Sequence, residues 1–247
     1  MEIQARLGSD IALVFDECTP FHADRDYTAA STERTHRWLD RCLTWHAGNG
    51  PGEQAVFGIV QGGTHEDLRR QSADAISAAG VDGIAIGGTL GETKEQMREV
   101  VGTTVGMLAV DAPKHLLGIG EPDDLVEGVG QGLDSFDCAV PTRLGRHGMA
   151  LAPLPERRFR YDVRKRVNQD EPGPLVAGCP CPACTRHSRA YVHYLSKAEE
   201  LTGVRLLTAH NLVYTNELMR GARDAILAGT YGCYRDAILA GAAPWMD

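Results

Sequence analysis

The sequence predicts an α/β protein in which strands and helices alternate over residues 10–140, followed by a smaller helical subdomain. Three observations carry this prediction. Short apolar runs ending in Gly, Asp or Pro recur, and each is followed by a polar stretch typical of a helix. Polar side chains stand where several of these apolar runs end. From about residue 150 the alternation stops and a cluster of cysteines appears. The alternation suits either a (β/α) barrel or an open doubly wound sheet.

The individual elements of the first part follow from this alternation. Strands are predicted at residues 11–15, 55–60, 83–86, 115–119 and 135–140, and helices at 32–47, 65–80, 93–108 and 122–133. The chain opens on "EIQARLG", which predicts a helix with no strand before it. Five strand–helix units are visible where a closed barrel needs eight, so we expect strands N-terminal to this sequence to be missing.

The two parts are predicted as two domains, the C-terminal part of a (β/α) barrel over residues 1–150 and a subdomain with the cysteine cluster and closing helices over 151–247. A strand pair at 148–154 and 158–163 leads into the cysteines. A helix over 188–201, a turn over 203–211 and a final helix over 212–229 complete the expected subdomain.

Charge and composition narrow the function classes. The 247 residues are 43% hydrophobic and carry a formal net charge of −8, which argues against a protein that coats nucleic acid non-specifically. One local exception is "RRFRYDVRKR" at 157–166, with six basic residues against one acid. It fits a nucleic-acid contact and a solvated hairpin equally well.

The cellular location is predicted from the lengths of the apolar runs, the first residues and the cysteines. No apolar run approaches the roughly 20 residues of a membrane span, and the first residues show no signal-peptide pattern. Seven cysteines, three of them clustered, fit a reducing compartment and a metal site better than a disulfide framework. We therefore expect a cytoplasmic protein that does not enter a membrane.

The clustered cysteines predict one structural zinc ion. Cys179, Cys181 and Cys184 form a CxCxxC pattern, whose thiolates can share a tetrahedral Zn²⁺. His187, His193 and His210 are the candidates for the fourth ligand. We prefer His210, because it would tie a second element to the cysteine loop. Three sulfurs and one nitrogen leave no open coordination position, so this metal would hold structure and would not activate water.

A second group of polar residues marks the carboxyl ends of the predicted strands, which form the catalytic face of a barrel. One such aspartate alone could be a helix cap, but several strand ends together favour a pocket. The group comprises Asp16, Gln61, Gly87 with Gly88, Gly118 with Gly120, and Asp137.

Six motifs in order resemble the bacterial tRNA-guanine transglycosylases, which exchange guanine in an anticodon for a 7-deazaguanine base. They are "LGSDIALVFDECTPF", "FGIVQGG", "IAIGG", "HLLGIGEPDDLVEGV", "FDCAVPTRLGRHG" and "CPCPAC" with "AHN", spread from residue 2 to near 240. The resemblance implies a (β/α)8 TIM-barrel-type fold that is incomplete at the N-terminus, with a zinc-binding helical subdomain.

The resemblance also implies roles for individual residues. Asp137 would be the nucleophile that attacks C1′ of the ribose at the wobble position and forms a covalent intermediate. Asp16 and Gln61 would read the hydrogen-bonding edge of the base. The remaining implied contacts are Gly87 and Gly88 beside the base, Leu117 and Gly118 over its flat face, and Arg143 and Arg146 on the anticodon backbone. The partners implied are a tRNA with a GUN anticodon, the 7-deazaguanine base and a second copy in a homodimer.

Two departures from the family pattern stand out. The family's "DSGGFQ" motif, whose Asp assists base exchange, does not occur, so the chain resembles the C-terminal portion of the enzyme and we expect little or no exchange by this chain alone. The loop "GGTLGE" at 87–92 is one residue shorter than the common bacterial form, which leaves open whether preQ1 or queuine is the preferred base.

Two other functions share some of these features. A non-catalytic tRNA-binding partner subunit of a transglycosylase would share the zinc site, but it would be expected to lose the nucleophile, and Asp137 is present. A zinc hydrolase needs an open metal position, which a site with three cysteines and one histidine does not supply.

Overall fold

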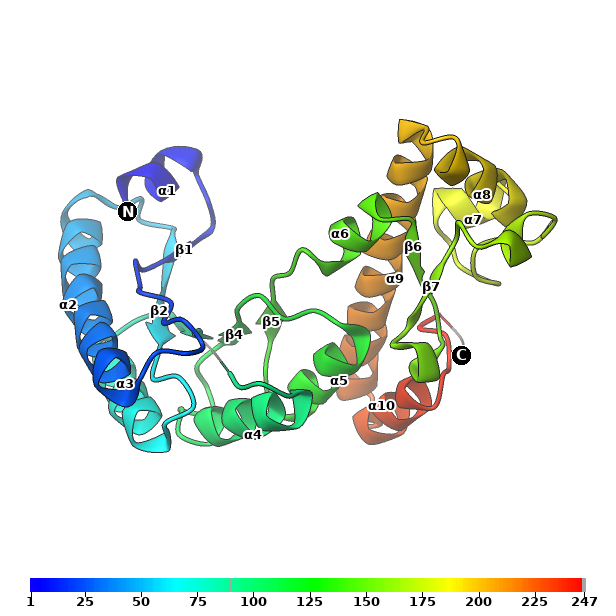
Figure 1. Cartoon of the computed structure of the whole chain (residues 1–247). Helices are drawn as coiled ribbons and strands as arrows, with labels where there is room; N and C mark the ends of the chain where they lie inside the picture. The colour runs from blue at the N-terminus through cyan, green and yellow to red at the C-terminus, as the bar shows by residue number, and fades with distance from the viewer. Residues whose placement is uncertain (89, 246–247) are drawn as a thin grey trace. The chain divides into compact units, whose positions relative to one another are not determined.

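The computed structural model describes residues 1–88 and 90–245, and it consists of two compact units (Figure 1). The first unit comprises Met1–Leu117 and Gln131–Phe136, and the second comprises Gly118–Gly130 and Asp137–Asp247. The predicted division into residues 1–150 and 151–247 stays a prediction.

A five-stranded parallel sheet forms the centre of the first unit, in the order β1-β2-β3-β4-β5. Neighbours in sequence are neighbours in the sheet, with no reversal of strand order, as in a barrel and unlike a doubly wound sheet. The predicted barrel-type α/β fold is therefore confirmed, as an arc of parallel strands. The strands are β1 (Ile11–Leu13), β2 (Ala55–Val60), β3 (Gly83–Ile86), β4 (Lys114–Leu116) and β5 (Ser135–Phe136).

Helices α1 (Glu2–Leu7), α2 (Arg25–Asn49), α3 (Glu66–Ala78) and α4 (Lys94–Val105) complete the first unit. Helix α2 begins seven residues before the predicted start, because the Asp24 side chain caps it by accepting a hydrogen bond of 2.7 Å from the Tyr27 N–H. Strands β2 and β3 match their predicted ranges. Their side chains are almost all buried, as expected for strands covered on both faces.

Strand β4 ends earlier than predicted for a local reason. Gly118 adopts φ +76°, a left-handed conformation that breaks an extended strand and that glycine adopts without steric cost. The chain therefore leaves the sheet after Leu116, where the implied base-contact residues begin.

The long helix α9 (Leu201–Leu227) organises the second unit, and α5, α6, α7, α8 and α10 all pack against it. The other elements are α5 (Pro122–Gly130), α6 (Val140–Arg146), α7 (Pro182–Arg186), α8 (Arg189–Lys197), α10 (Tyr231–Leu239), the antiparallel pair β6 (Met149–Leu151) and β7 (Arg160–Asp162), and the 3-10 turns η1 (Pro155–Arg157) and η2 (Arg166–Asn168). A core that includes Ala150, Val163, Leu175, Val192 and Leu207 joins the hairpin to the helices.

The predicted turn over residues 203–211 is wrong, because this segment lies inside α9. Gly203, at the start of this segment, allows close packing: a Cβ atom there would lie 3.0 Å from Cβ of Leu195 on α8. Helix α10 was not predicted from the sequence. None of the helices in the described residues is long and apolar enough to cross a membrane.

Candidate functional site

The implied base-contact residues of the first unit follow adjacent strands. Asp16 comes three residues after β1, Gln61 directly after β2, Gly87 and Gly88 after β3, and Leu117 after β4. Because these strands are parallel and lie in sequential order, their carboxyl ends share one edge of the sheet.

Asp16 and Gln61 form a hydrogen-bonded pair at this edge. The Gln61 Nε2 amide donates to Asp16 Oδ2 at 2.5 Å. Burial raises the pKa of Asp16, and the bond from Gln61 opposes part of that shift. Gln61 is fully buried, and its Oε1 atom has no hydrogen-bond partner among the described residues. A buried acceptor without a donor is costly, so this atom is suited to a ligand N–H.

A polar network behind Gln61 fixes its position. The Gln61 backbone N–H donates to the Ser72 hydroxyl at 3.1 Å, and this hydroxyl is also 3.0 Å from His36 Nε2. Burial lowers the pKa of His36. Ser72 itself is completely buried.

Arg69 supports the same turn. Its guanidinium donates to the carbonyl oxygens of Gly63 at 2.8 Å and Val60 at 3.2 Å, on either side of Gln61. Burial lowers the pKa of Arg69 to about 10, and its side chain therefore stays protonated near neutral pH. Sequence reasoning missed Arg69, although it falls on the buried face of α3 beside Leu68.

The two glycines after β3 allow backbone to approach the Gln61 amide. A Cβ at Gly88, which adopts φ +84°, would lie 2.3 Å from Gln61 Oε1. A Cβ at Gly87 would lie 2.9 Å from Gln61 Nε2 and 3.3 Å from Cδ1 of Leu117. Any larger residue would displace the amide that the pair depends on.

Asp137 and Gly118 lie together in the second unit. The Gly118 N–H donates to Asp137 Oδ1 at 3.0 Å, and the carboxylate is exposed. Helix α6 begins three residues later and carries Arg143 and Arg146, both exposed and without an ion-pair partner among the described residues. An exposed carboxylate and two exposed guanidiniums are thus carried on one short segment.

The predicted metal ligands converge in the second unit. The Nδ1 atom of His210 lies 3.5 Å from the sulfur of Cys179 and 3.4 Å from those of Cys181 and Cys184. Bonds of about 2.3 Å to sulfur and about 2.0 Å to nitrogen around a tetrahedral Zn²⁺ separate S and N by about 3.5 Å. All four ligand atoms lie within 4.8 Å of one another, so the donor set fits the ion.

The surroundings of the cluster prepare it for a metal. The Nε2 atom of His210 is 2.9 Å from the Leu151 carbonyl oxygen, to which it donates, and this leaves Nδ1 as the metal-facing atom. Hydrogen bonds from the thiols of Cys179 and Cys184 lower the pKa of Cys181. The prediction of a structural zinc site is confirmed with His210 as its fourth ligand.

The other two histidine candidates lie outside the cluster. His193 Nδ1 is 2.8 Å from the Val163 carbonyl oxygen, and the His187 ring stacks on Tyr191. The four ligands complete a tetrahedral shell, so the ion that they fit has a structural role.

Comparison with known proteins places the base-contact residues, Asp137 and the metal ligands within one family match. The family model described as "Queuine tRNA-ribosyltransferase" matches residues 1–243, which include every candidate residue named above. The chain belongs to the queuine tRNA-ribosyltransferase family. The predicted resemblance to the tRNA-guanine transglycosylases is thereby confirmed.

Curated members of the queuine tRNA-ribosyltransferase family show the extent of the match. Proteins of that name from Roseiflexus sp. (strain RS-1), Symbiobacterium thermophilum and Herpetosiphon aurantiacus are 50%, 47% and 47% identical to the chain. The alignments cover 95%, 96% and 95% of this chain but 61%, 58% and 58% of the relatives. The chain thus spans about three fifths of the length of these proteins.

Proposed function

We propose that this protein acts in queuosine tRNA modification, as a pentosyltransferase that exchanges guanine at the wobble position of a GUN anticodon for a 7-deazaguanine base, preQ1 or queuine. The observation that carries the proposal is the family match over residues 1–243 together with an exposed carboxylate at position 137. Asp137 is the proposed catalytic residue.

The proposed reaction has two displacements at C1′ of the ribose. A carboxylate oxygen of Asp137 bonds to C1′ while the glycosidic bond to guanine breaks, and guanine takes the electron pair and then a proton. The incoming base attacks C1′ through its deprotonated ring nitrogen, and the bond to Asp137 breaks. The Gly118 N–H, which donates to Oδ1, holds the carboxylate in place for both steps.

Asp16 and Gln61 are proposed to recognise both bases by one hydrogen-bonding edge. An ionised Asp16 accepts from N–H groups of the base, and Gln61 Oε1 offers the acceptor that lacks a donor among the described residues. Gly87 and Gly88 supply backbone groups beside the amide, and Leu117 and Gly118 are proposed to cover the flat face of the base. Turning the nucleotide out of its stack precedes these contacts.

Arg143 and Arg146 are proposed to bind the anticodon backbone, because exposed guanidiniums pair with phosphate in two hydrogen bonds. The homodimer is part of the same proposal. It is supported by the exposed Tyr191 and Tyr194 of α8, which are 42% and 64% exposed. We also propose a cytoplasmic location, because thiols kept as zinc ligands suit a reducing compartment.

Base recognition is tested without turnover by calorimetric titration of the chain with guanine. The Gln61→Leu variant removes the donor to Asp16 and the buried acceptor, so we expect about 100-fold weaker binding. Gln71→Leu, on the exposed face of α3, is the matched control and should bind like the parent. Equal affinity of both variants would contradict the assignment of Gln61.

Exchange is tested in a hybrid in which residues 1–243 replace the matching segment of the Roseiflexus relative. We expect radiolabelled guanine to enter a tRNA with a GUN anticodon, and Asp137→Asn to slow this by about 10⁴-fold, the scale for loss of a nucleophile. Asp170→Asn, an exposed aspartate of the same unit, is the control. Undiminished exchange by the Asp137→Asn hybrid would overturn the proposal.

A further inference from the structure

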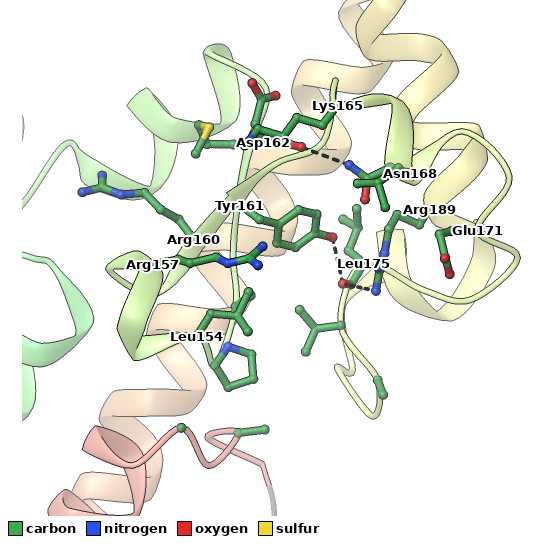
Figure 2. A pocket seen from close by; sticks show the side chains of 18 residues that line it. Leu154, Arg157, Arg160, Tyr161, Asp162, Lys165, Asn168, Glu171, Leu175 and Arg189 are labelled. Atoms are coloured by element: carbon green, nitrogen blue, oxygen red, sulfur yellow. Dashed lines mark hydrogen bonds between the residues drawn. The ribbon is translucent and has the colours of Figure 1, made fainter.

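A cavity of about 1040 Å³ lies in the second unit, away from the residues assigned so far. Its wall is formed by β7, the turn η1, the segment of residues 165–177 and the start of α8 (Figure 2). Neither the zinc ligands nor Asp137 lines it. Its volume is slightly above the range of about 300–1000 Å³ that is usual for ligand sites.

We infer that this cavity binds an unpaired nucleotide of an RNA, with the base in its apolar interior and the phosphate on its basic rim. The inference takes RNA as the partner from the proposed function, but it does not depend on the chemistry at Asp137.

The interior offers a stacking surface. Leu154, Leu175 and Val176 supply apolar wall, and the Tyr161 hydroxyl donates to the Leu175 carbonyl oxygen at 2.8 Å, which fixes the ring. The Arg189 guanidinium lies 5.4 Å from the centre of that ring. Aromatic rings and guanidinium planes are the surfaces on which proteins stack unpaired bases.

Hydrogen bonds hold Arg189 in this position. Its guanidinium donates to the carbonyl oxygens of Pro174 and Leu175, each at 3.2 Å. No carboxylate pairs with it among the described residues. Its positive charge is therefore available to an anion in the cavity.

The charges on the rim leave a positive excess. Asp162 is paired with Arg164 at 3.0 Å, and Arg160 with Glu121 at 2.9 Å. Figure 2 shows Arg157 pointing toward Tyr161, whereas Arg160 points away from it.

The other charged side chains that line the cavity decide the sign of its net charge. Arg157 lies 3.6 Å from Glu156, a contact between exposed side chains that contributes little. Lys165 has no ion-pair partner in the described part of the chain, and Glu171 is the one lining carboxylate there that is likewise unpaired. Arg157, Lys165 and Arg189 together outweigh Glu171, so the cavity favours an anion.

The surrounding sequence favours a polyanion over a small free anion. Residues 143–166 carry eight Lys or Arg against two acidic residues, in a chain whose net charge is −8. Such a local excess recruits nucleic acid by releasing its counterions. An apolar interior behind the rim suits a base better than a bare phosphate.

The rim is tested by fluorescence anisotropy of the zinc-loaded chain with labelled GUN tRNA over a series of salt concentrations. Arg157→Glu and Lys165→Glu should each weaken binding about tenfold and reduce the salt slope by about one. Glu171→Gln should do the opposite and tighten binding about two- to threefold. Arg223→Glu makes the same charge change on the exposed side of α9, outside the cavity, and should have a much smaller effect.

The interior is tested by filling it. Ala177 lines the cavity and is exposed, so Ala177→Trp should occupy the base position without changing charge and weaken tRNA binding by about tenfold. Ala228→Trp, at the end of α9, is the control. Zinc content and circular dichroism should match the parent in all variants.

The outcomes separate this inference from the proposed function. Equal effects of Arg157→Glu, Lys165→Glu and Arg223→Glu, or no tRNA binding by the parent chain, overturn the nucleotide site. A loss in the Glu variants without a loss in Ala177→Trp also overturns it, because the rim would then be a surface phosphate contact. If Arg157→Glu and Lys165→Glu bind tRNA like the parent while the hybrid still exchanges guanine, the base-exchange function is supported and the nucleotide site is not. If the hybrid is inactive while rim and filling variants lose tRNA, only the nucleotide site stands.

Discussion

Two polar clusters of this protein differ in completeness. One contains a buried acceptor without a hydrogen-bond donor among the described residues, and the other contains all four ligands for one metal ion. Around Asp16 and Gln61, in the first unit, one buried acceptor has no donor in the described residues. Around Cys179, Cys181, Cys184 and His210, in the second unit, four ligand atoms point at a single centre and fit one ion. The second cluster therefore fits a resident ion, whereas the first has an acceptor that the proposed base ligand would satisfy.

This difference implies that binding energy contributes to folding at the metal cluster and to ligand recognition at the Asp16–Gln61 cluster. A cluster that a resident metal completes contributes to folding, because the ligands are brought together only in the folded chain. A cluster left one bond short costs stability until a donor reaches it, and under the proposed function this cost favours recognition of the base that supplies the donor. Three predictions test this comparison further.

The largest effect is expected at the metal cluster. Structural zinc contributes on the order of 10 kcal/mol to folding, so Cys181→Ser or chelation should unfold much of the second unit. The measurements are zinc per chain by atomic emission and hydrogen exchange in α7 and α9. Cys233→Ser, at an exposed thiol on α10, should retain one zinc. A Cys181→Ser protein with full zinc and unchanged exchange would show that the cluster is dispensable.

A smaller effect is expected behind Gln61. Replacing Arg69 by Met removes the donor to the buried Gly63 carbonyl oxygen and one of two donors to that of Val60, which keeps the bond from the Gly87 N–H. We expect a cost of about 2 kcal/mol in the free energy of unfolding. Arg70→Met removes an exposed ion pair with Glu66 at 3.0 Å and should cost at most about 0.5 kcal/mol. Urea unfolding of the two variants makes the comparison. Equal losses would mean that Arg69 does not support the Gln61 turn.

The smallest effect is a pH dependence from Asp16. Its pKa is raised above the ordinary 3.8, so the folded state binds more protons than the unfolded state just above that pH. The contribution of Asp16 to stability should therefore decrease as pH rises from 3.8 through the raised pKa, and then level off. Under the proposed function, guanine affinity should increase over the same window, because the ionised carboxylate would accept hydrogen bonds from the base.

Asp16→Asn should remove both slopes. Unfolding in urea and guanine titration, each repeated at several pH values from 4 to 7 in the parent and the variant, measure them. Identical pH profiles for parent and variant would assign the titration to another group.

Much of the fold could be predicted because it depends on patterns among residues that are close together in the sequence. The alternation of apolar runs and polar helical stretches placed β2 and β3 at their observed bounds, since both strands are buried on two faces and apolar throughout. Local patterns failed where packing overrode them. The segment 203–211, predicted as a turn, lies inside α9, where Gly203 allows close contact with α8, and Arg69 is a charged residue on a buried helix face.

The sequence by itself determined the α/β class, the CxCxxC ligands and the family, because these depend on residue types at short and fixed spacings. Only the tertiary structure decided which histidine completes the metal shell, across 31 positions from Cys179, and that Gln61 binds Asp16, 45 positions away, with one acceptor left over. Contacts at such separations arise from the pairing of strands and the packing of helices, and no local spacing in the sequence records them.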